Sequence, residues 1–206
     1  MNIRPRLTLL LTLACLDASA FAASVRVLVT DGNGKPVPDA VIYAEPLSSR
    51  GLPKQLPTVS IEQKQRQFLP LVTAIEAGSA VSFPNHDTVR HHVYSFSPAK
   101  TFELKLYSGV PANPIVFDKP GTVVVGCNIH DKMVAYIHVV NTPYFTKTDA
   151  GGQAVLEALA AGSYQLRAWH YNLPPAAPIP QQALSVNGAD SAASFRISLK
   201  ADAVAH

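Results

Sequence analysis

The chain has 206 residues, of which 48% are hydrophobic and only 15% are charged, and its formal net charge is +3. This composition excludes a disordered tail, and the lack of any basic run excludes a nucleic-acid binder that relies on phosphate contacts. The 17 prolines and 11 glycines separate short apolar, β-branched runs, which predicts an all-β protein.

The N-terminal stretch, residues 1–22, is typical of an export signal. Basic "MNIRPR" precedes apolar "LTLLLTLACL", and "DASAFAAS" offers small residues for cleavage. We place the cut after Ala22, with a cut after Ala20 as the alternative. A lipoprotein would use Cys15, but Thr12 stands where a lipobox has leucine. The apolar run is too short to span a bilayer, so we expect a soluble protein exported to a bacterial periplasm.

Two stretches near the ends of the chain share a strand-and-turn pattern. Ser24–Pro46 predicts two strands joined by the turn "DGNGKPVP", and Thr146–His170 predicts further strands with the turns "DAGG" and "AGSY". Together they resemble the two halves of a small immunoglobulin-like sandwich of the carboxypeptidase-regulatory or collagen-adhesin kind. We expect Tyr164 and Trp169 to pack in its core.

The middle of the chain alternates apolar and polar residues, as antiparallel strands do. We expect residues 59–141 to form a second β-sandwich, inserted into the immunoglobulin-like one formed by residues 23–58 and 142–200. The alternative is two domains in tandem. Insertion is favoured because Ser24–Pro46 is too short to hold a sandwich core by itself.

Cys127 is the one cysteine that we expect the mature chain to keep. Exported proteins normally pair their cysteines, so a single thiol is either buried and inert, paired with another chain, or bound to something.

The strands on either side of Cys127 indicate where the thiol points. In "TVVVGC", Val123 and Val125 share a strand face with Cys127, so the thiol faces the core. Met133 begins the next strand on its inward face, and His130 lies in the loop between. This loop can bring Cys127, His130 and Met133 to one point.

These residue types point to copper. Two imidazoles, a thiolate and a long axial thioether form the ligand set of blue-copper electron-transfer sites. A further histidine must come from upstream, and neighbouring residues of a strand face opposite ways. The stretch "FPNHDTVRHHVYSF" offers three candidates, His86, His91 and His92.

Cys-x-x-His-x-x-Met, preceded by "F.N.D...HHV", resembles the cupredoxins, and its spacing is that of amicyanin. In plastocyanin-like members the ligand histidine stands two residues before a valine, which matches His91 to Val93. The resemblance therefore implies one copper, cycling between Cu(I) and Cu(II), on four metal ligands: His91, Cys127, His130 and Met133.

The likeness extends over residues 61–140 and implies a Greek-key β-sandwich. The family pattern "F.P..i.v..G..v.F.N.D" fits Phe68, Pro70, Gly78, Phe83, Asn85 and Asp87. The whole chain looks like the exported plastocyanin-like proteins often labelled methylamine utilisation proteins.

Several residues depart from the family pattern or stay outside it. His92 stands where the family usually has asparagine, so it is a partial substitute or an alternative ligand. Asp131 places a carboxylate beside His130, near the expected metal. We expect His138 and His170 to be ordinary polar-face residues.

We expect electron transfer to a protein redox partner through the exposed edge of His130. No Ser/His/Asp arrangement is visible, and a closed copper site has no open position for substrate, so we do not expect an enzyme. Two alternatives stay open: a copper carrier or chaperone with the same ligands, and a metal-free adhesion or binding sandwich.

Overall fold

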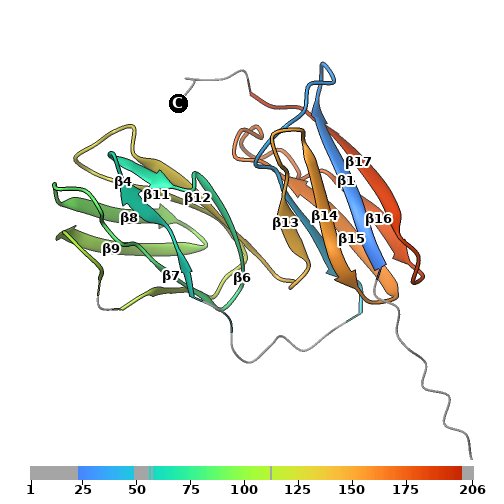
Figure 1. Cartoon of the computed structure of the whole chain (residues 1–206), viewed down its shortest axis with the longest axis horizontal. Coiled ribbons are helices and arrows are strands. Elements are labelled where there is room, and N and C mark those ends of the chain that lie inside the picture. The colour runs from blue at the N-terminus through green and yellow to red at the C-terminus, as the bar shows by residue number, and fades with distance from the viewer. Residues whose placement is uncertain (1–22, 49–55, 57, 112, 201–206) are drawn as a thin grey trace, which may run out of the picture.

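The chain folds into two groups of β-strands, one built from both ends of the sequence and the other from its middle (Figure 1). The computed structural model describes residues 23–48, 56, 58–111 and 113–200. Every regular element in these residues is a strand, which confirms the all-β prediction. The expected leader, with its cleavage site and Cys15, lies outside the described residues. Within them, no helix is long and apolar enough to cross a bilayer.

We call the first group the terminal sandwich. Its strands are β1 (Ala23–Asp31), β2 (Val41–Pro46), β13 (Phe145–Lys147), β14 (Gln153–Leu159), β15 (Gly162–Trp169), β16 (Gln181–Val186) and β17 (Ser191–Ile197). They form one sheet in the order β14-β1-β17 and another in the order β13-β2-β15-β16. Alternate residues of β1 are buried between the sheets, from Val25 to Val29, because successive side chains of a strand face opposite ways. Tyr164 lies in this core, as expected.

Two of the three predicted turns of the terminal sandwich are each held by an aspartate. The carboxylate of Asp31 accepts hydrogen bonds from two backbone amides of its turn, and so does that of Asp149. Strands β1 and β2 belong to different sheets, so "DGNGKPVP" crosses between the layers of the sandwich.

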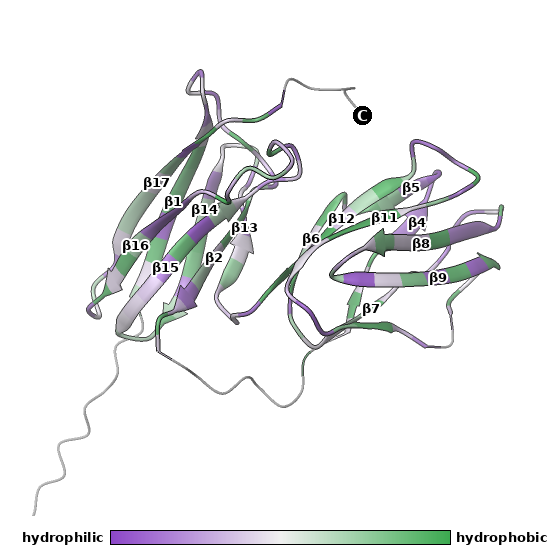
Figure 2. Cartoon of the chain, turned by 180° about the vertical axis from the view of Figure 1, so that it is seen from behind, coloured by the Kyte–Doolittle hydropathy of each residue, from purple (hydrophilic) through white to green (hydrophobic). Residues whose placement is uncertain are grey.

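We call the second group the central sandwich. Its strands are β3 (Thr58–Ser60), β4 (Glu62–Lys64), β5 (Gln67–Leu69), β6 (Val72–Glu76), β7 (Ser79–Ser82), β8 (His91–Ser97), β9 (Lys100–Tyr107), β10 (Ile115–Phe117), β11 (Gly121–Gly126) and β12 (Val134–Val140). A five-stranded sheet, β6-β12-β11-β8-β9, packs against a three-stranded sheet, β10-β7-β3, and β4 pairs with β5. Figure 2 shows the strands from behind, with hydrophobic and hydrophilic bands along β8 and β9.

The two sandwiches meet at a junction cluster, whose buried members are Val41, Tyr43, Val72, Val140 and Trp169. The cluster joins the outer faces of two sheets, and Figure 1 shows β6 and β13 on the facing sides. Lys147 on β13 crosses the junction and donates a hydrogen bond of 2.8 Å to the carbonyl oxygen of Val72 on β6. The junction is therefore packed and hydrogen-bonded.

Two expectations fail at this junction. Trp169 packs in the junction cluster and not in the core of the terminal sandwich, because it lies on the outer face of β15. His138 is 3% exposed, so it is no ordinary polar-face residue. Its ring stacks on Trp169, with centroids 4.3 Å apart and planes at 10°. His170 is also buried, at 4% exposure.

Candidate metal centre

Three predicted residues converge at one end of the central sandwich. The sulfur of Cys127 lies 4.0 Å from Nδ1 of His91 and 3.8 Å from Nδ1 of His130. The ligand atoms of all three residues lie within 4.8 Å of one another. The two imidazole rings meet edge to face, with centroids 5.0 Å apart. Two nitrogen donors and one sulfur donor thus face a common point.

The side chains of His91 and Cys127 are positioned by the ends of two neighbouring strands. His91 is the first residue of β8, and Cys127 follows the last residue of β11. Gly126 pairs with Tyr94, which fixes the register of β11 against β8. The loop after Cys127 closes with a hydrogen bond of 2.9 Å from the Met133 amide to the His130 carbonyl oxygen. This turn carries His130 back over the thiol.

The spacing of the donors suits a bound metal ion. Metal–nitrogen bonds of about 2.0 Å and a metal–thiolate bond of about 2.3 Å, at angles between tetrahedral and trigonal, separate the nitrogen and sulfur donors by roughly 3.5–3.7 Å. The distances of 3.8 and 4.0 Å from the Cys127 sulfur are close to this range. Only small movements of the side chains would be needed to bind an ion.

Burial differs among the three residues. His91 is completely buried and Cys127 is 4% exposed, whereas His130 is partly exposed. Cys127 forms no disulfide within the described part of the chain. A centre built on these residues would be shielded from water, with His130 at the surface.

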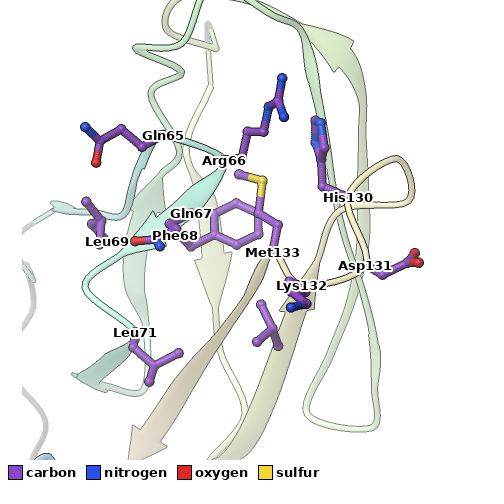
Figure 3. Close-up of a pocket in the computed structure, with 11 residues that line it drawn as sticks. Gln65, Arg66, Gln67, Phe68, Leu69, Leu71, His130, Asp131, Lys132 and Met133 are labelled. Atoms are coloured by element: carbon purple, nitrogen blue, oxygen red, sulfur yellow. The ribbon is translucent and has the colours of Figure 1, made fainter. Parts of the chain in front are cut away.

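Met133 lies beside this cluster, immediately before β12. It is 1% exposed and packs in the core of the central sandwich. Figure 3 shows its thioether directed toward the side of the pocket where Arg66 and His130 lie. A thioether therefore lies on the same side of the pocket as His130.

The other two histidine candidates lie elsewhere. His92 faces outward from β8, with Nε2 2.9 Å from a carboxylate oxygen of Glu103. His86 is exposed. Of the three upstream histidines, only His91 belongs to the cluster with Cys127 and His130.

A carboxylate does lie against the cluster, but it is not the expected one. Asp131 is exposed, stays outside the cluster, and points away from the His130 ring in Figure 3. Instead Asp87 lies 2.8 Å from Nε2 of His91. Burial favours a higher pKa for Asp87, but hydrogen bonds from the Arg66 amide, the His91 ring and the Gln65 amide hold its pKa below the usual value. The only signal for Asp87 in the sequence was its place in "F.N.D", four residues before His91.

A pocket of about 700 Å³ opens beside His130, and nothing in the sequence indicated it. The β4–β5 hairpin lines one side with Arg66 and Phe68, and the loop before β12 lines the other with His130 and Met133 (Figure 3). The edge of His130 is therefore reachable from a recess in the surface.

No model of a protein family matches the chain, and no curated protein matches it. Several solved structures are similar to it over about half its length. A copper-containing nitrite reductase from Thermus scotoductus SA-01 is 24% identical over 48% of this chain and 26% of that chain, with a TM-score of 0.40. A purple cupredoxin from Nitrosopumilus maritimus is 22% identical over 40% of this chain and 98% of that chain (TM-score 0.35). Amicyanin from Paracoccus versutus is 18% identical over 48% of this chain and 97% of that chain (TM-score 0.35).

Proposed function

We propose that the chain is an exported blue-copper electron-transfer protein that holds one copper ion through His91, Cys127, His130 and Met133. The observation that carries the proposal is the cluster of two imidazole nitrogens and one thiol, two of its three residues buried, with the donors close enough to share one metal ion.

The chemistry of the donors favours copper over other metals. Zinc sites of the structural kind are closed by four cysteine or histidine ligands, and this cluster has three. A thioether completes the set here, and a trigonal His₂Cys site with a weak axial methionine is the blue-copper arrangement. Thiolate and thioether suit Cu(I), and imidazole suits both oxidation states.

The way the ligands are anchored favours electron transfer. His91, Cys127 and Met133 lie at the ends of strands that are buried in one core, so these three side chains cannot move far when the charge of the metal changes. A partly exposed His130 ring, beside a surface recess, gives a protein redox partner close approach to the metal.

We propose that residues 59–141 form a cupredoxin domain inserted into an immunoglobulin-like domain of residues 23–58 and 142–200. In support, the sheets of the terminal sandwich join strands from both ends of the chain. This layout holds the copper domain at both of its ends, and the junction cluster fixes one face of its larger sheet. We further propose that residues 1–22 are removed on export to the periplasm.

Adding Cu(II) to the purified protein tests the proposal. We expect one equivalent to bind and to give an intense visible absorption band from thiolate-to-copper charge transfer. Cys127→Ser removes this band, because a hydroxyl is not a soft charge-transfer ligand. His86→Ala, a control on an exposed histidine, keeps it. A band that survives Cys127→Ser, or no stoichiometric binding at all, would refute the copper centre.

A second measurement separates an electron carrier from a copper carrier. The loaded protein should pass through repeated reduction and reoxidation beside a moderate Cu(I) chelator, with its colour returning in full. Stoichiometric loss of copper to the chelator on the first reduction would instead identify a protein that delivers copper.

A further inference from the structure

We propose that Asp87 is a positioning residue for the centre: its carboxylate fixes the His91 ring so that Nδ1 faces Cys127. This inference rests on the proposed copper site. It concerns a residue that does not itself touch the metal.

The two nitrogens of His91 face different partners. Nε2 lies 2.8 Å from Oδ2 of Asp87, and Nδ1 lies 4.0 Å from the sulfur of Cys127. An ionised carboxylate can only accept a hydrogen bond, so Nε2 must carry the proton. In a neutral imidazole this leaves the lone pair of Nδ1 free, on the side of the ring that faces the Cys127 sulfur. The contact with Asp87 therefore sets both the tautomer and the orientation of the ring.

Asp87 is itself held from several sides. Its Oδ1 accepts a hydrogen bond of 2.6 Å from the amide of Gln65, and its Oδ2 accepts one of 2.9 Å from the amide of Arg66. Its own amide donates a hydrogen bond of 2.9 Å to Oδ1 of Asn85. A carboxylate anchored in this way can direct a ring that is completely buried.

The turn that donates to Asp87 has an unusual sequence for its backbone conformation. Gln65 and Arg66 join β4 to β5 and have φ angles of 55° and 59°. A two-residue hairpin turn with positive φ at both positions normally uses asparagine and glycine. Side chains with a Cβ rarely adopt this conformation, and here both amides of the turn donate to Asp87. The carboxylate thus joins the hairpin that lines the pocket to a metal-binding histidine.

His92, the next residue of β8, also has a carboxylate partner, and this second pair offers a control. His92 and Glu103 are 2.9 Å apart on the outer face of β8 and β9. The Glu103 side chain is 55% exposed, whereas that of Asp87 is 14% exposed. Removing the charge of Glu103 changes another carboxylate–histidine contact without touching the centre.

A positioned carboxylate has a predictable effect on the metal. It makes the bound imidazole a stronger donor, and partners of this kind contribute about 10–100-fold to metal affinity. Its negative charge stabilises Cu(II) more than Cu(I). Asp87 should therefore strengthen Cu(II) binding and lower the reduction potential.

The first test needs no copper. Long-range ¹H–¹⁵N NMR of the metal-free protein at pH 8 reports the tautomer of each histidine. We expect His91 to carry its proton on Nε2 in the wild type and in Asp87→Asn, whose amide oxygen can still accept it. Asp87→Leu should give mixed tautomers, and Glu103→Gln should leave His91 unchanged. A proton on Nδ1 in the wild type, or a fixed Nε2 tautomer in a folded Asp87→Leu, would overturn the inference.

The second test uses Cu(II) titration and redox titration of the same variants. Asp87→Asn should lower Cu(II) affinity about 10-fold or more and shift the potential upward, whereas Glu103→Gln should match the wild type. If Asp87→Asn has the same Cu(II) affinity and the same potential as the wild type, the inference is overturned. This result is decisive even if Asp87→Leu does not fold. If the wild type binds no copper, the proposed function fails, and the tautomers alone then decide the role of Asp87.

Discussion

Protonation of His138 should control the acid stability of this protein. The ring is buried at the junction of the two sandwiches, stacked on Trp169, with Nδ1 3.1 Å from the hydroxyl oxygen of Thr122. Burial lowers the pKa of His138 from 6.5 to about 3. In the unfolded chain the same imidazole takes up a proton near its ordinary pKa.

The sign and size of the effect follow from this difference. Between pH 6.5 and about 3 the unfolded chain binds more protons at His138 than the folded protein does, so the free energy of unfolding falls as the pH falls. Stability from this residue is complete above about pH 6.5 and decreases by about 1.4 kcal/mol for each pH unit below it. At pH 5 the loss amounts to about 2 kcal/mol.

His138→Phe isolates this contribution, because phenylalanine keeps an aromatic ring on Trp169 but cannot be protonated. Urea denaturation of the metal-free protein at pH 7.5 and pH 5 can be followed by the fluorescence of Trp169, the single tryptophan of the chain. Between these pH values the wild type should lose about 2 kcal/mol more than His138→Phe. His86→Gln, at an exposed histidine, should behave as the wild type does. Equal losses in the wild type and His138→Phe, or an NMR titration of His138 near pH 6.5, would refute the reasoning.

The features that the sequence predicted correctly depend on strand periodicity. A strand alternates its faces with a period of two residues, so the position of Cys127 after Val123 and Val125 determined that the thiol faces inward. The same rule showed that His91 and His92 face opposite ways. It could not show which of them faces the thiol, because that depends on the register between β8 and β11, which are separated by a long stretch of chain.

The features that the sequence did not predict depend on contacts between distant elements. His138 and Trp169 lie on the outer faces of two different sheets. They are buried only because one sandwich packs on the other. The sequence marked Asp87 only by its place in "F.N.D", and the hydrogen bonds that it accepts from the β4–β5 turn are visible only in the folded structure. The carboxylate of Asp131 was expected near the metal from sequence proximity alone, and the direction of the loop turned it outward.

Three further predictions concern the centre and the fold around it. Met133→Leu should retain copper but raise the reduction potential in a redox titration, because an axial donor is lost. His91→Ala should abolish the visible band of the copper protein, whereas His92→Ala should keep it. The reverse result would show that His92, and not His91, is the copper ligand. Gly152→Ala should destabilise the terminal sandwich by about 2 kcal/mol or more in thermal or urea denaturation. Gly152 has a φ of +70°, and a Cβ there would lie 2.4 Å from the carbonyl oxygen of Val29, which is backbone and cannot rotate away. Gly32→Ala is the matched control, since a Cβ at Gly32 meets nothing within 4 Å. If both variants unfold at the temperature of the wild type, the close approach of β1 to the turn before β14 is not what holds that turn.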